Sequence, residues 1–422
     1  MGKEKYNNFI DTLKYVGKVG LITTIIATLI GIGIIYYLEK NDSPFLNKSI
    51  TVVEEQETIP ETTASEQPSE LEVIAKDVTQ ESLERAMDEV IDSFVHQKNF
   101  MFAEDEEYKN LYLFVKDDCD KKGIDFRHAL SEFWAESLLT QIKFDNGNYK
   151  PVTSVANAFG FTQMTKIALD DLDQKGIKDP CGNRWDFEKT KYDPVYNIAA
   201  GISFLKLIED WYLKPNNIEP NKWADAFYYI AGYDAVNAMK VHGSNPKEYV
   251  GNLENIVGKD RADQIKFYFN CIEIYDEASE QAESPLKGDF DVDVVEQNGE
   301  MKGLALKPKE DKTVYAMLSG KVAIAGEEAN RYGTKDNGKW VQILSYFVDN
   351  FAPIKVSYIL LDEVNENIKP GMYIEVGTPI GKASEKTKMM GALGYENQGG
   401  GGLVINLVDF LVPSIYGSSI QR

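Results

Sequence analysis

Residues 125–137, DFRHALSEFWAES, decide the fold of the central part of this chain. Asp125 is placed to cap a helix, because a side-chain oxygen at this position can accept hydrogen bonds from the first backbone N–H groups. Apolar residues then recur on one helical face, at Leu130, Phe133, Trp134 and Leu138. Glu136 falls in the last turns of the predicted helix, so we expect a carboxyl group at a helix end with apolar neighbours.

Three motifs follow this helix. They are GFTQM at residues 160–164, NIAAG at residues 197–201 and YIAG at residues 229–232. The first is a glycine-hinged turn with an amide side chain, and the other two belong to predicted helices whose small residues allow backbones to approach closely. Helical spacing covers residues 79–117, 198–208, 223–239 and 262–275. We therefore predict an all-α domain over residues 79–283.

The Glu136-Ser137 pair and the three motifs, in this order, resemble the soluble lytic transglycosylases and goose-type lysozymes over residues 120–280. In that family the glutamate of an E-S pair is the general acid/base that cleaves the glycan strand of peptidoglycan. The resemblance therefore implies a lysozyme-like fold with Glu136 as the catalytic residue. It also implies a substrate groove that includes Ser137, Gln163, Met164 and Tyr229.

Three features depart from the family pattern. Thr162 stands where an apolar residue is usual, and Ile230 stands where the family prefers asparagine. The interval between Glu136 and Gln163 is also long, so we expect an inserted loop near residues 145–148.

The chemistry of glycoside cleavage fits this interpretation of Glu136. The reaction needs a protonated acid at the leaving oxygen. A glutamate surrounded by apolar groups at a helix end keeps its proton near neutral pH. A solvated surface glutamate is the alternative, and the ordered motifs downstream favour catalysis. Glu132, one turn earlier, is expected on the surface.

A second carboxylate would distinguish two reactions. Lytic transglycosylases need none, because the substrate's own hydroxyl attacks and gives an anhydro sugar, whereas lysozymes often use one to position water. Asp145, nine residues after Glu136, is the candidate catalytic helper. Its alternative role is a turn aspartate before Asn146-Gly147, so the sequence leaves both products open.

After residue 284 the pattern changes to short apolar or alternating runs separated by Gly, Asn and Asp. This pattern predicts a β-rich domain over residues 284–422. The expected strands cover residues 313–317, 321–325, 340–344, 354–361, 373–376 and 403–407. Asp289, Asp291 and Asp293 have the offsets of an EF-hand loop, but Val294 stands where that loop requires glycine. We expect them on the polar face of a strand.

This region resembles the lysostaphin-type zinc endopeptidases of the M23 family over residues 295–415, through TVYA at 313–316, GKV at 320–322 and GTPIG at 377–381. Those enzymes bind zinc with a histidine, an aspartate and a second histidine from a late H-x-H. The corresponding positions here are Met301, Ala305, Leu360, Gly402 and Val404, and no histidine follows His242. Such side chains do not supply a zinc site. The resemblance therefore implies an inactive peptidase fold without a metal cofactor.

The N-terminal part predicts a membrane anchor. Residues 19–38 contain no charge and match the thickness of a bilayer, which predicts a single transmembrane helix. A cleaved signal peptide is the alternative, but its apolar region is normally shorter. Four lysines precede the helix, so the positive-inside rule places residues 1–18 in the cytoplasm and the C-terminus outside. Residues 39–78 are acidic and rich in Pro, Thr and Ser, which predicts a disordered tether.

The net charge of −22 argues against a nucleic-acid partner, because Lys and Arg supply most of that affinity. Cys119, Cys181 and Cys271 lack C-x-x-C spacing, so they predict no zinc or redox motif and select no disulfide. The histidines His96, His128 and His242 are far apart and are expected to be surface or core residues, not ligands.

Together these features predict a multidomain, membrane-anchored peptidoglycan glycosidase, a lytic transglycosylase with no cofactor. It would open the wall locally for virion entry or for a secretion or conjugation machine. The expected partners are peptidoglycan glycan strands, the lipid bilayer and subunits of a virion or secretion complex. The alternative is a catalytically inactive wall-binding or structural assembly protein.

Overall fold

The structure is a computed structural model of the chain. It describes residues 81–83, 85–86, 111–139, 142–145, 148–154, 157–297, 300–326, 338–394 and 403–416. The chain divides into two units, Met1–Ile74 and Ala75–Arg422, and every described residue belongs to the second. The predicted cytoplasmic segment 1–18, transmembrane helix 19–38 and tether 39–78 lie outside the described residues. No helix in the described ranges combines the length and apolar character needed to cross a bilayer.

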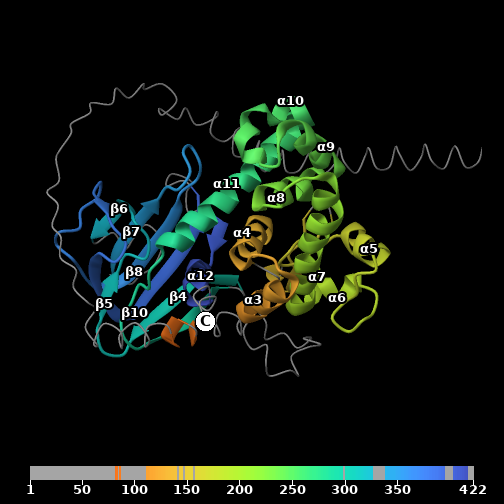
Figure 1. Cartoon of the computed structure of the whole chain (residues 1–422). Coiled ribbons are helices and arrows are strands. Elements are labelled where there is room, and N and C mark those ends of the chain that lie inside the picture. Colours follow the sequence, from red (N-terminus) through yellow and green to blue (C-terminus); the bar gives the residue numbers. More distant parts are fainter. Residues whose placement is uncertain are drawn as a thin grey trace, which may run out of the picture. The chain divides into compact units, whose positions relative to one another are not determined.

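Helices make up the first part of the described unit (Figure 1). They are α3 (Leu111–Lys122), α4 (Phe126–Ser137), α5 (Lys166–Gln174), α6 (Phe187–Tyr192), α7 (Pro194–Leu207), the π-helix η3 (Ile208–Leu213), the 3₁₀ helix η4 (Lys214–Asn216), α8 (Lys222–Ala231), α9 (Tyr233–His242), the 3₁₀ helix η5 (Pro246–Asn252), α10 (Leu253–Val257) and α11 (Lys259–Gln281). The helices predicted near residues 198–208 and 262–275 are confirmed.

Two local features differ from the expected all-α domain. A two-stranded antiparallel hairpin, β1 (Ile142–Asp145) and β2 (Asn148–Pro151), lies where an inserted loop was expected. The single helix expected over residues 223–239 is in fact α8 and α9. Gly232 separates them with φ +58°, a conformation that glycine adopts without the steric cost of a side chain, and its N–H donates to the Tyr228 carbonyl.

α7 lies in the core of the helical part. Asp193 caps its N-terminus by accepting the Tyr196 N–H at 3.0 Å, and Pro194 occupies the first helical turn, where its missing N–H costs nothing. Almost all of its residues are buried, and the helix packs against α3, α5 and α6. Such a helix is apolar on every side, so it is a core helix and not the amphipathic helix that the spacing at 198–208 suggested.

The second part is a nine-stranded antiparallel sheet in the order β3-β4-β10-β8-β7-β6-β9, with β5 and β11 also paired to β10. Its strands are β3 (Phe290–Gln297), β4 (Glu300–Pro308), β5 (Thr313–Tyr315), β6 (Gly320–Gly326), β7 (Lys339–Ser345), β8 (Ile354–Val364), β9 (Tyr373–Ile374), β10 (Pro379–Leu393) and β11 (Leu403–Ile405). The expected β-rich region is confirmed. The sequence did not predict β4 or β10, although β10 pairs with four other strands.

The acidic residues that have EF-hand spacing form ion pairs along β3. Lys309 lies 3.1 Å from Asp289 and 3.3 Å from Asp291, and Lys307 pairs with Asp293. Val292, between them, is buried. The expected strand with one polar face is therefore confirmed.

Helical and β residues share one hydrophobic core. The last elements, η7 (Leu407–Leu411) and α12 (Val412–Tyr416), pack against α11. Phe410 of η7 lies with its ring 5.8 Å from Trp134 and 5.7 Å from Tyr275. Asp409 is buried beside it and accepts hydrogen bonds from the Tyr112 hydroxyl and the Asn406 amide. Ala75–Arg422 forms one compact unit that is not divided further. The predicted boundary between domains 79–283 and 284–422 therefore stays a prediction.

Candidate functional site

α4 carries the polar residues His128, Glu132 and Glu136 one turn apart. The predicted cap is confirmed, since the Asp125 carboxylate accepts the His128 N–H at 2.9 Å. The helix ends at Leu138, which is left-handed with φ 53° and donates its N–H to the Trp134 carbonyl. The two caps set where α4 begins and ends, and therefore the direction in which the three polar side chains point.

Glu136 is half-buried near the end of α4, as the sequence predicted. Burial, together with the nearby Glu132 charge, raises the pKa of its carboxyl to about 8. A hydrogen bond with the Tyr268 hydroxyl acts in the opposite direction. Glu136 is therefore protonated near neutral pH, which is the state that a general acid needs.

Two tyrosines accompany Glu136. Burial and the Glu136 charge hold the pKa of both Tyr229 and Tyr268 well above the usual range, so both hydroxyls keep their protons. Tyr229 of α8 donates to the Thr162 carbonyl at 2.6 Å, and Tyr268 of α11 donates to the Glu132 carbonyl at 3.2 Å. The sequence predicted Tyr229 at the site but missed Tyr268, which lies on a predicted helix outside every family motif.

The GFTQM turn is held by Asn197 of α7. The Asn197 Oδ1 accepts the Thr162 N–H at 2.8 Å, and its Nδ2 donates to the Phe159 and Thr190 carbonyls at 2.8 and 2.9 Å. Gly201 permits the close approach, because a Cβ there would lie 2.5 Å from the Thr162 side chain. The structure thus gives a physical reason for the small residue in the NIAAG motif.

Three of the predicted substrate-binding residues are engaged within the protein. Gln163 has φ 47° and donates its amide to the Gly160 carbonyl at 2.7 Å. Ser137 donates to the Phe161 carbonyl at 2.6 Å, so it joins the end of α4 to the turn. Met164 is fully buried in the core. Their substrate contacts stay predictions, and their described contacts stabilise the turn and join it to the end of α4.

Asp145 is the last residue of β1 and lies opposite Asn148 of β2. Its side chain lies outside the described part of the structure. The role of Asp145 as catalytic helper stays a prediction.

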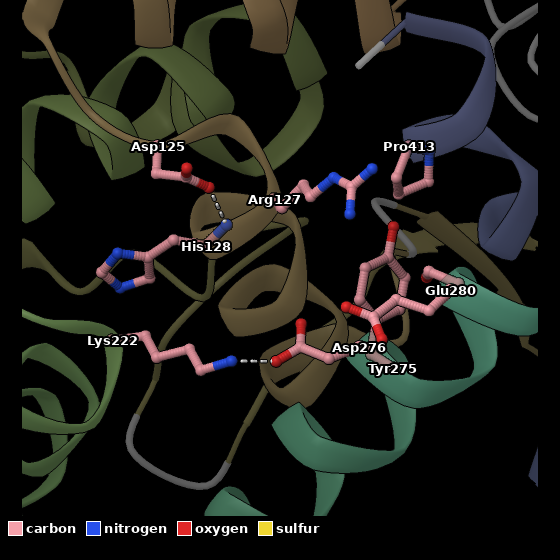
Figure 2. A pocket seen from close by; sticks show the side chains of 9 residues that line it. Asp125, Arg127, His128, Lys222, Tyr275, Asp276, Glu280 and Pro413 are labelled. Carbon is pink, nitrogen blue, oxygen red and sulfur yellow. Dashed lines mark hydrogen bonds and ion pairs between the residues drawn. The ribbon is translucent and has the colours of Figure 1, made fainter. Parts of the chain in front are cut away.

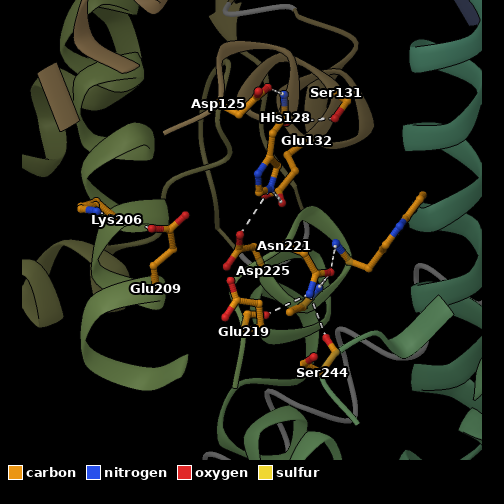
Figure 3. Close-up of polar contacts among 12 residues, drawn as sticks. Asp125, His128, Ser131, Glu132, Lys206, Glu209, Glu219, Asn221, Asp225 and Ser244 are labelled. Atoms are coloured by element: carbon orange, nitrogen blue, oxygen red, sulfur yellow. Dashed lines mark hydrogen bonds and ion pairs between the residues drawn. The ribbon is translucent and has the colours of Figure 1, made fainter. Parts of the chain in front are cut away.

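His128, Glu132 and Asp225 form a buried cluster between α4 and α8 (Figure 3). The His128 Nε2 lies 2.7 Å from Glu132 Oε1 and 3.4 Å from Asp225 Oδ2. Burial would lower the pKa of His128, but the two carboxylates outweigh it and raise the value to about 9. Glu132 is only 1% exposed, so the expectation of a surface residue is wrong. The face of α4 that carries it is covered by α8 and α11.

A pocket of about 370 Å³ opens beside this cluster (Figure 2). His128 lines it together with Asp125, Arg127 and the ion pair of Lys222 with Asp276. The residues predicted to bind the glycan do not line this pocket.

The β-rich part contains the positions that correspond to the zinc ligands of the M23 pattern. Ala305 lies in β4, Leu360 in β8 and Val404 in β11, and Gly402 lies outside the described residues. Leu360 occupies a bulge with φ 59°, where its carbonyl accepts the Ser384 and Thr387 hydroxyls at 2.7 and 2.9 Å. Aliphatic side chains cannot coordinate zinc, so these positions do not fit the metal.

All three cysteines are free in the structure. Cys119 and Cys271 are buried, and Cys181 is exposed.

Comparisons with known proteins give limited similarities. No family model and no curated protein sequence matches the chain. Among solved structures, the catalytic domain of the antimicrobial peptidase lysostaphin from Staphylococcus simulans matches 24% of this chain and 71% of its own, with 20% identity and a TM-score of 0.19. A longer structure of lysostaphin matches 29% of this chain and 47% of its own, with 19% identity and a TM-score of 0.22. With scores this low, the function must be argued from the residues of the chain itself.

Proposed function

We propose that the protein is a peptidoglycan-cleaving glycosidase in which Glu136 is the general acid/base. The observation that carries the proposal is the Glu136 carboxyl, which is half-buried at the end of α4 and whose pKa is raised to about 8. The order of the E-S, GFTQM, NIAAG and YIAG motifs supports the same function.

The mechanism follows from the protonation state of Glu136. Its carboxyl donates a proton to the glycosidic oxygen while the C–O bond breaks and an oxocarbenium-like centre forms. The resulting carboxylate then accepts the proton of the attacking hydroxyl group. In a lytic transglycosylase that hydroxyl belongs to the same sugar and the product is an anhydro sugar; in a lysozyme it belongs to water. Between the two steps the Tyr268 hydroxyl stabilises the carboxylate by turning its one proton from the Glu132 carbonyl towards Glu136.

The surrounding residues keep Glu136 in place. Ser137 binds the carbonyl of Phe161, and Tyr229 binds that of Thr162, so two helices hold the same turn. A fixed acid is worth more than a mobile one, because misplacement of about 1 Å can cost a large factor in rate.

We further propose the cellular context that the sequence predicts. Residues 19–38 anchor the chain in the membrane with the C-terminus outside, and residues 39–78 extend the enzyme towards the wall. The target is a local opening of the wall, for virion entry or for a secretion or conjugation machine. The sheet would act as a wall-binding or assembly module, since its M23-like positions carry aliphatic side chains.

The test is clearing of purified peptidoglycan by the full chain. Glu136→Gln keeps the shape of the side chain but removes the acid, so we expect a loss of about 10²-fold or more. Glu188→Gln is the matched control, because its side chain is 72% exposed and pairs only with Lys191 at the surface. Equal clearing by wild type and Glu136→Gln would remove Glu136 from the mechanism. Absence of clearing by the wild type would favour the inactive wall-binding alternative.

Mass spectrometry of the digested glycan separates the two reactions. Anhydro ends indicate the transglycosylase. Reducing ends that are lost in Asp145→Asn would indicate hydrolysis with Asp145 positioning the water.

A further inference from the structure

We propose that His128, Glu132 and Asp225 bind one divalent transition-metal ion of the Zn²⁺ or Mn²⁺ type between α4 and α8. This proposal does not depend on the glycosidase activity, since it concerns a cluster one to two turns away from Glu136 along α4. The prediction from the sequence was that the chain holds no metal, because its histidines and cysteines lack ligand spacing. That spacing argument did not include carboxylates brought in from a distant helix.

The geometry of the cluster fits a metal ion. One ligand atom from each residue lies within 4.8 Å of the others. Zinc binds imidazole nitrogen and carboxylate oxygen at about 2.0–2.2 Å, so ligand atoms around one ion are separated by roughly 3–4 Å. The His128 Nε2 is already 2.7 Å from Glu132 Oε1 and 3.4 Å from Asp225 Oδ2. Small side-chain rotations suffice to admit an ion.

The second observation concerns buried oxygen atoms that lack a hydrogen bond. The Glu132 Oε2 and both carboxylate oxygens of Asp225 are buried and make no hydrogen bond. Glu132 and Asp225 are each 1% exposed, so water does not solvate them. A buried carboxylate is costly unless it is protonated, paired or bound to a metal. One imidazolium balances one carboxylate, whereas a divalent cation balances both.

The donor set selects the class of ion. One imidazole nitrogen with two carboxylates suits Zn²⁺ and Mn²⁺, whereas Ca²⁺ prefers six to eight oxygen ligands. Glu209 of η3 adds negative potential, since its charge acts on both Glu132 and Asp225. Glu209 is itself paired with Lys206 and Lys214 at 3.5 and 3.3 Å.

The site also has a supporting frame and an entrance. The Asp125 cap fixes the start of α4 at His128, and the Tyr268 hydroxyl binds the Glu132 carbonyl. The pocket of about 370 Å³ is lined by His128, whose side chain is 11% exposed. An ion would displace the proton of the imidazole, which lies next to Glu132 and Asp225, and bind beside the carboxylates (Figure 3).

The test measures metal retention by the untagged full chain. The protein is stripped with a chelator, equilibrated with Zn²⁺ or Mn²⁺, passed through a desalting column and examined by elemental analysis. We expect about one ion per chain and a rise in Tm on metal addition. Glu132→Gln and Asp225→Asn keep the side-chain shape and remove one anionic ligand, so metal affinity should fall by at least about tenfold. Asp170→Asn, at an exposed pair with Lys166, is the matched control.

X-ray absorption at the zinc edge gives a readout that does not depend on folding of the variants. Nitrogen and oxygen ligands without sulfur are expected from this site. Sulfur ligands would assign the zinc to a cysteine such as the exposed Cys181 and overturn the proposal. Failure of the wild type to retain either ion, or equal retention by Asp225→Asn, would overturn it as well.

Discussion

The surroundings of Glu136 hold its carboxyl in the protonated form near neutral pH. Burial and the Glu132 charge raise its pKa, and the Tyr268 hydrogen bond lowers it. The balance, about 8, leaves the acid protonated up to mildly alkaline pH. Two of the three influences come from single residues, Glu132 and Tyr268, so substitution of either one should shift the pKa.

The pH dependence of clearing should report this balance. Activity of the wild type should fall by about tenfold for each pH unit above 8, because the general acid loses its proton. Tyr268→Phe removes the hydroxyl that favours the carboxylate, so the alkaline limb should move to higher pH. The measurement is the pH profile of initial clearing rates for the two proteins. An alkaline limb at the same pH in both would show that Tyr268 does not set the acidity of Glu136.

Residue-level prediction succeeded where the signal is local. The Asp125 cap and the position of Glu136 near the helix end depend on neighbours within a few residues, and both are confirmed. Glu132 was placed wrongly, because its face of α4 is covered by α8 and α11, which are distant in sequence. The spacing of His128 and Glu132 on one helix face was visible in the sequence, but the third member of the cluster was not.

At the level of elements, α7 packs closely against the GFTQM turn through Gly201 and Asn197. Gly201→Ala would place a Cβ 2.5 Å from Thr162, and the turn is fixed there by Asn197. Overpacking of this kind costs about 1–3 kcal/mol, which outweighs the gain in helix propensity from alanine of about 1 kcal/mol. We therefore expect lower stability in chemical denaturation and weaker clearing. Gly251→Ala is the control, since no atom lies within 4 Å of its added Cβ, and no loss of stability there is expected.

The strands illustrate why some elements could not be predicted. The strands β6, β7 and β8 were recognised because their residues are rich in apolar side chains, which are most completely buried in β7. β10 has alternate residues buried over Thr387 to Leu393, but lysines and glutamate interrupt it and Gly391 fills one inward position. Gly391 is required there because a Cβ would meet Leu407 at 2.6 Å. A strand with few large apolar side chains is stabilised by its four partner strands, and those are invisible to local periodicity.

At the level of the whole molecule, Phe410 connects η7 to α4 and α11. Phe410→Ala should lower the free energy of unfolding by about 3–5 kcal/mol, because its ring packs against Trp134 and Tyr275 in the shared core. The loss should appear in chemical denaturation followed by tryptophan fluorescence. Phe267→Ala is the matched control, since that ring is 43% exposed, and its effect should be much smaller. Equal effects of the two substitutions would show that Phe410 does not hold the helical part.

The buried carboxyl of Asp409, next to Phe410, makes the stability of the fold depend on pH. Burial raises the pKa of its carboxyl from the ordinary 3.8 to about 8, against the Tyr112 and Asn406 hydrogen bonds. Between these values the folded chain keeps a proton that the unfolded chain releases, so the contribution of Asp409 to folding stability is full below about pH 4 and is lost as the pH rises through about 8. A carboxylate formed there would weaken the core that the helices and the sheet share. At alkaline pH we expect η7 to detach from α11 before the rest of this core opens, whereas mildly acidic pH should strengthen the contact between them.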